Sequence, residues 1–223
     1  MGNQYLRIGE IMETKDYLKQ IAEELHTSVM ATVDKDGHPV TCAIDIMDWD
    51  DSGLYFLTAR GKSLYDRLTA DGHLAITLMR GDDTMSTLAI SFKGRAREIG
   101  PDRLPALFEK NPYMYEIYPG EESRRALTVF HIYEGTGEWF NMGNGNIEHA
   151  EFSLGAVVIE DEGYYVTDIC IGCGSCISVC PRNAISIENS GSMAEIDQAH
   201  CIRCGNCRET CPVDAIIIGN KSL

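Results

Sequence analysis

The chain has little positive charge: its 223 residues include 19 lysines and arginines against 34 aspartates and glutamates, a formal net charge of −15 at pH 7. Nucleic-acid binding needs a basic surface that neutralises phosphates, so this composition argues against a nucleic-acid partner. The sequence also lacks any apolar run near the roughly 18 residues that indicate a membrane-spanning helix. We therefore expect no membrane partner either, and we attribute the acidity to ordinary solubility.

Three other kinds of signal are missing. Residues 1–20 contain neither the basic start nor the apolar stretch of a secretory signal, so we expect a cytoplasmic protein with reduced thiols. The six histidines form no set with metal-ligand spacing. Gly143-Asn144-Gly145 lacks both the third glycine and the strand–helix surroundings of a dinucleotide-binding loop, which excludes a Rossmann-type NAD site.

Cysteine, by contrast, is abundant, and eight of the nine cysteines lie in two runs with the same spacing, C-x2-C-x2-C-x3-C-P. The stretches 170–187 and 201–218 are identical at ten positions, which indicates two copies of one structural unit. This spacing is the bacterial ferredoxin signature for [4Fe-4S] clusters, in which the fourth cysteine of each run ligates the other cluster. Clusters of this kind are oxygen-sensitive, so we expect an anaerobic or low-oxygen organism.

The spacing assigns the ligands across the two copies, because a short loop can reach only three corners of a cubane before the chain turns away. One cluster is expected on Cys170, Cys173, Cys176 and Cys211, and the other on Cys201, Cys204, Cys207 and Cys180. Two structural zinc ions are a weaker alternative, since zinc sites normally use two C-x2-C pairs separated by a longer spacer. A disulfide framework is weaker still in a reducing compartment.

Residues 1–150 show a different pattern, in which short strand-like segments alternate with turns. Apolar residues at helical spacing predict a first helix over Thr14–Leu25. Further on, the patterns predict a helix at 62–70 and strands at 28–33, 40–47, 54–58, 74–79, 85–98, 127–133 and 138–142. Frequent strands with few helices favour an α+β domain built on a closed or nearly closed antiparallel barrel.

The two patterns divide the chain into a barrel domain over 1–150 and a small cluster domain over 164–223. We place the linker at 151–163, within a join rich in glycine, asparagine and acidic residues that begins at residue 144. Residues 155–159 are a candidate for one further strand.

Four segments of the barrel region carry a resemblance to a known family: ATVDKDGHPV (31–40), LYFLTARGKSLYDRL (54–68), PDRLPALFEKNPYMYEIYP (101–119) and GEWFNM (137–142). From Tyr17 to Phe152 the chain resembles the FMN-binding split-barrel family typified by pyridoxamine 5′-phosphate oxidase. The resemblance implies a homodimer that holds FMN in a groove between two split barrels. It does not carry over the oxidase activity, because the cysteine runs stand where the true oxidases have an arginine-bearing carboxy-terminal segment.

By this resemblance, Thr58 and Lys62 contact the FMN phosphate, with Arg60 and Ser63 within reach of the same group. The helix that starts there supplies backbone N–H groups and a positive dipole end, both of which attract an anion. The ring would lie beside the strand residues Thr41, Cys42 and Ala43, and Trp139 would cover the flavin of the neighbouring subunit. Many members carry an arginine near position 42, so Cys42 leaves the phosphate clamp incomplete.

Each of these residues also has a purely structural interpretation. Lys62 is equally typical of a solvated helix start, and Cys42 of a small buried apolar side chain. Trp139 would also suit a position that closes the barrel core. No acid–base pair stands out as catalytic; Asp45 and Tyr55 are among several side chains that could face the ring.

Together the two regions predict an oxidoreductase that passes electrons between two [4Fe-4S] clusters and FMN to reduce a small-molecule acceptor. FMN suits this task because it joins one-electron to two-electron chemistry. A low-potential electron donor or acceptor protein is the implied partner. One alternative is an electron-transfer or cofactor-binding protein without its own substrate, whose barrel holds FMN, haem or a deazaflavin as relay or cargo. Another is a barrel without a cofactor that only docks the ferredoxin.

Overall fold

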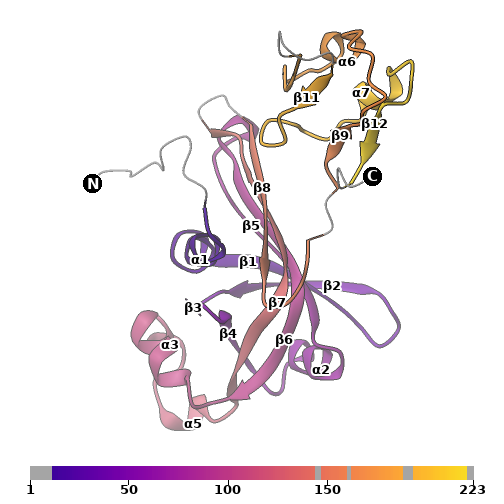
Figure 1. Cartoon of the computed structure of the whole chain (residues 1–223). Helices are drawn as coiled ribbons and strands as arrows, with labels where there is room; N and C mark the ends of the chain where they lie inside the picture. Colours follow the sequence, from indigo (N-terminus) through magenta and orange to yellow (C-terminus); the bar gives the residue numbers. More distant parts are fainter. Residues whose placement is uncertain (1–11, 144–146, 160–161, 188–192, 220–223) are drawn as a thin grey trace. The chain divides into compact units, whose positions relative to one another are not determined.

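The computed structural model describes residues 12–143, 147–159, 162–187 and 193–219 (Figure 1). The chain forms two compact units. The first contains the chain up to Trp139 together with Glu151–Val158, and the second contains Phe140–Ala150 and the chain from Ile159 onward.

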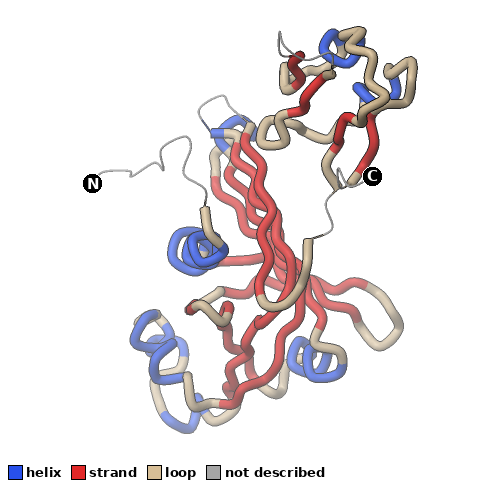
Figure 2. Tube along the Cα trace, viewed as in Figure 1, coloured by secondary structure: helices blue, strands red, loops and turns tan. Residues whose placement is uncertain are grey.

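An eight-stranded sheet is the main element of the first unit, with strand order β2-β1-β5-β6-β7-β4-β3 and with β8 paired to β7. Its strands are drawn in red in Figure 2. The strands are β1 Thr27–Val33, β2 Pro39–Asp45, β3 Asp48–Asp50, β4 Gly53–Ala59, β5 His73–Arg80, β6 Leu88–Gly100, β7 Leu127–Asn141 and β8 Glu148–Leu154. Neighbouring strands run antiparallel, as in the hairpin of β1 and β2, where Val29 faces Ala43. The α+β class and the antiparallel barrel that the sequence predicts are therefore present.

Helices connect and flank these strands. They are α1 Thr14–Lys19, which continues as the π-helix η1 Gln20–Leu25, then α2 Ser63–Ala70, the 3₁₀ turn η2 Thr84–Ser86, α3 Leu104–Lys110, α4 Met114–Ile117 and α5 Glu121–Arg124. No helix among the described residues is long and apolar enough to span a bilayer.

The core follows from the alternation of apolar residues along the strands. In β5, Leu74, Ile76 and Leu78 are buried while the residues between them face solvent, as a two-residue period requires. Strand β4 is buried on both faces. Phe56 stacks on Phe130 of β7 inside the barrel at 5.5 Å between ring centroids, and Tyr55 belongs to a second apolar cluster with α3.

The structure corrects the predicted break between two strands at 127–133 and 138–142, because β7 is a single strand. Close packing explains the glycines in the middle of β7. A Cβ on Gly135 would lie 2.3 Å from the Lys93 carbonyl oxygen, and one on Gly137 would lie 2.3 Å from the Phe152 ring. Glycine here lets two neighbouring strands and an aromatic ring approach closely.

Three other boundaries differ from the prediction. Strand β6 begins at Leu88, because the Asp83 carboxylate accepts a hydrogen bond from the Ser86 amide and caps the turn η2 where a strand start was expected. Residues 151–154 of the expected linker belong to β8, whose Phe152 and Leu154 are buried. Residues 155–159 form no strand. Part of the expected join, 144–146, lies outside the described residues.

The second unit repeats one motif twice: a strand, a cysteine loop, a one-turn helix and a second strand. Its elements are β9 Tyr164–Val166, α6 Ser175–Ser178, β10 Ile185–Ile187, β11 Ala194–Ile196, α7 Asn206–Glu209 and β12 Ile216–Ile218. The copies interlock, because β9 pairs with β12 and β10 pairs with β11. Their small apolar core includes the side chains of Cys176 and Cys207. A core of this size supplies little stability alone, so bound metal would contribute to folding.

Candidate functional site

The eight cysteines of the two runs line two pockets in the second unit, four in each. One pocket is lined by Cys170, Cys173, Cys176 and Cys211. The other is lined by Cys180, Cys201, Cys204 and Cys207. These are the two sets of four that the spacing assigns, and each set takes three residues from one copy and one from the other. We name them the first and the second cysteine pocket.

Corresponding turns in the two copies shape these pockets. Gly174 and Gly205 precede α6 and α7 with φ of 75° and 81°, a left-handed conformation that glycine adopts without strain. The amides of Ala184 and Ala215 donate to Cys180 Sγ at 3.3 Å and to Cys211 Sγ at 3.2 Å. Hydrogen bonds to sulfur favour the thiolate, which is the ligand form of cysteine.

The donor chemistry of both pockets fits an iron–sulfur cluster. Each offers four sulfur atoms, and no histidine or carboxylate lines either pocket among the described residues. Thiolate-only sets select zinc or iron–sulfur clusters, and the crossed arrangement matches the dicluster ferredoxin pattern. Burial raises the pKa of the Cys176 and Cys207 thiols, so assembly of a cluster must release their protons.

In the first unit, the expected phosphate-binding residues surround the start of α2. Thr58 is the last residue but one of β4 and has 2% of its surface exposed, and its hydroxyl has no hydrogen-bond partner among the described residues. Lys62 is the N-cap of α2 and Ser63 its first residue, and both are exposed. A buried hydroxyl without a partner near a helix N-terminus fits a site whose anionic ligand supplies the missing contact.

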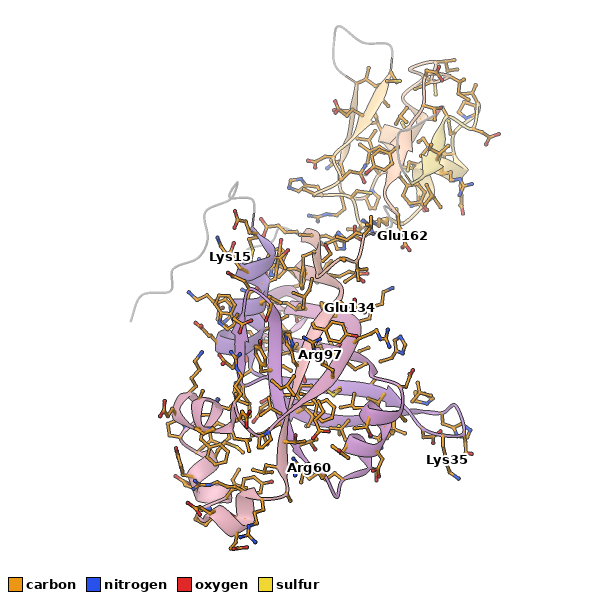
Figure 3. All side chains as sticks on the ribbon, turned by 60° about the horizontal axis from the view of Figure 1, so that its bottom comes forward. Lys15, Lys35, Arg60, Arg97, Glu134 and Glu162 are labelled. Atoms are coloured by element: carbon orange, nitrogen blue, oxygen red, sulfur yellow. The ribbon has the colours of Figure 1, made fainter. Side chains whose placement is uncertain are left out.

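Arg60, labelled in Figure 3, pairs with groups of its own chain. Its guanidinium lies 3.5 Å from Glu98 Oε1 and donates to the Arg125 carbonyl at 3.3 Å. Glu98 also accepts hydrogen bonds from Thr128 at 2.6 Å and from Tyr65 at 2.9 Å. In this structure Arg60 therefore neutralises a carboxylate near the expected phosphate position.

The prediction from sequence did not include Arg67, a second cation beside Lys62 that lies within α2. Arg67 Nε donates to Thr32 Oγ1 of β1 at 2.7 Å. Burial raises the pKa of the Cys42 thiol, while the charges of Arg67 and Lys62 lower it, so both cations lie close to this thiol. Arg67 thus supplies a guanidinium from α2 in the area where position 42 lacks one. Its place one helical turn after Ser63 is the signal that could have revealed it.

Strand β2 divides the other predicted flavin contacts between its two faces. Thr41 and Ala43 are exposed, whereas Cys42 points to the opposite, half-buried side. The exposed face continues over β1 and β5, where Val29 is 58% and Met79 65% exposed. A flat face of small and apolar side chains therefore lies beside the strand that the resemblance places along the ring.

Trp139 contacts its own chain. Its indole Nε1 donates to Gln20 Oε1 at 2.8 Å, and its ring centroid lies 6.4 Å from that of Tyr17. These contacts match the structural alternative, in which Trp139 closes its own barrel. Its expected contact with a neighbouring flavin stays a prediction.

Asp45 and Tyr55 occupy different surroundings. Asp45 lies on the Thr41–Ala43 side of β2 and accepts hydrogen bonds from Tyr113 at 2.8 Å and Thr27 at 2.7 Å. Tyr55 is buried in the second apolar cluster, where its ring stacks on His131 with centroids 4.6 Å apart. Of the two, only Asp45 lies toward the expected flavin face.

A charged network beside Tyr55 predicts how the stability of the first unit depends on pH. Burial would raise the pKa of Asp50, but hydrogen bonds from Ser52, Tyr55 and Arg103 outweigh it and lower the pKa to about 2. An unfolded aspartate titrates near 3.9. The stabilisation is therefore fully present above about pH 4 and is lost as the pH falls through about 2.

Urea unfolding at about pH 5 and about pH 3, followed by tryptophan fluorescence, is expected to give a lower midpoint at the acidic value. Asp50→Asn removes the titrating group and should reduce this difference. Equal pH dependence in the two proteins would contradict the assignment to Asp50.

Comparison with known proteins matches both units separately. The sequence profile of the family described as pyridoxamine 5′-phosphate oxidase matches residues 14–139, and a 4Fe-4S dicluster domain profile matches residues 169–215. A ferredoxin from Butyribacterium methylotrophicum is 56% identical over 36 residues, which are 16% of this chain and 60% of that protein. The match thus spans less than two thirds of the ferredoxin.

Among solved structures, the chain is similar to a NimC/NimA family protein from Clostridium acetobutylicum. The two are 16% identical with a TM-score of 0.51, over 63% of this chain and 92% of the other. At this identity the likeness shows the fold alone. The split barrel and the ferredoxin-type 4Fe-4S domain predicted from the sequence are both confirmed.

Proposed function

The chain belongs to the pyridoxamine 5′-phosphate oxidase family, and from this premise we propose that it is an iron–sulfur flavoprotein oxidoreductase. Two [4Fe-4S] clusters in the cysteine pockets exchange electrons with FMN in the barrel, and the flavin reduces a small-molecule acceptor. The observation that carries the proposal is the arrangement of the cysteines, four in each pocket with one from the other copy. Clusters that transfer electrons, attached to a barrel of this family, favour a redox cofactor in the barrel that can exchange electrons with them.

The residues of the barrel fit FMN at the start of α2. Thr58 contributes an unpartnered buried hydroxyl, Lys62 a full charge, and the α2 N-terminus its amides and dipole. Arg67 adds a second cation on the side of β1. When bound, FMN takes up electrons singly or in pairs and can deliver them as hydride, which is the chemistry that joins the clusters to an organic acceptor.

The exposed face of β1, β2 and β5 supports the homodimer that the resemblance implies. A second copy would cover Val29 and Met79 and would place the ring beside Thr41 and Ala43 between the two barrels. Asp45 and Tyr113 lie on this side of β2, so they are available to position the acceptor. An acceptor protein or donor protein with a low potential completes the relay.

The test is anaerobic purification of the full chain, an absorption spectrum, and identification of the cofactor released on denaturation. Limited dithionite is then added, and the cluster and flavin bands are followed together. We expect FMN in the released fraction and electrons that equilibrate between clusters and flavin. Electrons that stay on the clusters while the flavin remains oxidised would overturn the proposal.

The same preparation separates the alternatives. A reduced protein that reacts only with partner proteins, and with no nitroaromatic or enoate compound, would be an electron carrier without its own substrate. A preparation with full clusters and no releasable cofactor would favour a barrel that only docks the ferredoxin domain.

Lys62→Met is expected to weaken FMN binding about tenfold to a hundredfold, because a hydrogen bond to a charged group contributes about 1.5–3 kcal/mol. The measurement is a titration of flavin-free protein with FMN, followed by flavin fluorescence. Lys35→Met, at the tip of the β1–β2 hairpin with 90% of its side chain exposed, is the matched control. Equal dissociation constants for the two variants would remove Lys62 from the site.

A further inference from the structure

The two cysteine pockets share their spacing but differ in charge. Arg182 follows Cys180-Pro181 and lines the second pocket. At the equivalent place in the other copy, Val213 follows Cys211-Pro212 and lines the first pocket. The two copies can therefore be compared directly, because Arg182 of one copy occupies the place that Val213 occupies in the other.

Arg182 has a buried donor atom that lacks a partner. Its Nε is buried without a hydrogen-bond partner, and none of the described residues forms an ion pair with its guanidinium. Burying a charged donor without a partner is costly, so such groups are normally paired. An anionic group inside the second pocket would provide the missing partner, and a cluster held by four thiolates is anionic.

Most neighbouring positions also make the segments of the second pocket more positive than those of the first. The loop of the second pocket contains Arg203 and Arg208, where the loop of the first contains Gly172 and Ile177. Asp214, three residues after Cys211, stands where the other copy has Asn183. One exchange has the opposite sign, because Glu209 replaces Ser178. Among these exchanged positions, the ligand segments of the second pocket carry three arginines and one glutamate, and those of the first carry one aspartate.

A charge in the pocket lining affects the reduction of a cluster held there. A cluster gains one negative charge when it accepts an electron, and nearby positive charge stabilises that state. Net charge around the cluster is one of the factors that set its potential. Arg182 is half-buried with an inaccessible Nε, so solvent screens its field less than that of the exposed Arg208.

We propose that the cluster in the second pocket has the higher reduction potential and that Arg182 is the residue that sets the difference. This inference rests on the proposed function, which places one cluster in each pocket. A single electron leaves the reduced cluster of the first pocket, which is oxidised, and reaches the cluster of the second pocket, which is reduced. No bond forms or breaks, and the direction of transfer inside the unit follows from the charges.

The test is a redox titration of the full chain under anaerobic conditions, with the reduced clusters detected by electron paramagnetic resonance. The unmodified protein is expected to reduce in two separate waves. Arg182→Val should lower the potential of the higher wave by at least a tenfold change in its one-electron equilibrium, which is about 59 mV, and leave the lower wave in place. Arg208→Ile, which also restores the residue type of the other copy, should shift neither wave measurably.

Two further variants make the test reciprocal. Val213→Arg should raise the lower wave, and Arg182→Gln, which keeps a hydrogen-bond donor but removes the charge, should shift the higher wave as Arg182→Val does. The inference is overturned if the unmodified clusters reduce together, or if removing the charge of Arg182 moves neither wave or both equally. Iron and sulfide analysis distinguishes failure of this inference from failure of the proposed function. Two clusters per chain with equal potentials reject only this inference, whereas fewer than two reject the proposed function.

Discussion

Replacing Cys211 with serine is expected to halve the iron and acid-labile sulfide of the anaerobically purified protein. Cys211 lines the first pocket with Cys170, Cys173 and Cys176, although it belongs to the run that supplies the second pocket. A second substitution then shows which cluster was lost. Adding Cys173→Ser should remove nothing more, because both residues serve one cluster, whereas adding Cys204→Ser should remove the remaining iron.

Ligation within each run predicts the opposite pattern. In that case Cys204→Ser would add nothing to Cys211→Ser, and Cys173→Ser would remove the remaining iron. Cys42→Ser is the control, since Cys42 is the one cysteine outside both pockets and its loss should leave the iron content unchanged. The experiment therefore decides between crossed and uncrossed ligation by iron analysis alone.

Arg103→Met is expected to lower the free energy of unfolding of the first unit by about 1.5–3 kcal/mol, because the buried Asp48 carboxylate loses one of its two cationic partners. The Asp48 side chain is 2% exposed and accepts from Arg103 at 2.9 Å and from Lys110. Arg103 also lies 3.0 Å from Asp50 and 3.5 Å from the centroid of the Tyr55 ring. One guanidinium thus joins β3, β4 and the start of α3.

Both tryptophans, Trp49 and Trp139, lie in the first unit, so their fluorescence during urea unfolding reports on that unit. Arg125→Met is the control, because the Arg125–Glu122 pair is exposed at both ends and such pairs contribute little. Adding Asp48→Asn to Arg103→Met should recover part of the loss, since the buried charge that has lost a partner is then removed. A loss no larger than that of Arg125→Met would show that Asp48 does not depend on Arg103.

The second unit could be predicted in detail because its information is local. The cysteine spacing, the glycines before the one-turn helices and the repeat itself all lie within short stretches, and they assign the same sets of four that line the pockets. The spacing could not reveal the buried, unpartnered Nε of Arg182, since that depends on how the two copies interlock.

The barrel was predicted less completely because several of its features depend on partners distant in the sequence. Alternating apolar residues located most strands, but Gly137 is explained by Phe152, and Asp48 by Arg103 and Lys110. The candidate flavin contacts came from family resemblance, since residue types alone gave Lys62 and Cys42 two interpretations each. Arg67 was missed because its partner, Thr32, lies on another strand.

Because each pocket takes one cysteine from the other copy, the two sets of four cysteines are completed in a fixed order during synthesis. The last strand of the barrel sheet, β8, ends at Leu154, so the first unit has all its strands before any residue of the cysteine runs is made. The ligand set of the second pocket is complete once the ribosome has passed Cys207, and that of the first only after Cys211. Of the eight cysteines in the two runs, Cys170, Cys173 and Cys176 are made first, and they therefore wait longest for their fourth partner. During this interval they are open to oxidation, so if the first pocket holds a cluster as proposed, its insertion comes late, onto a chain whose barrel is free to fold beforehand.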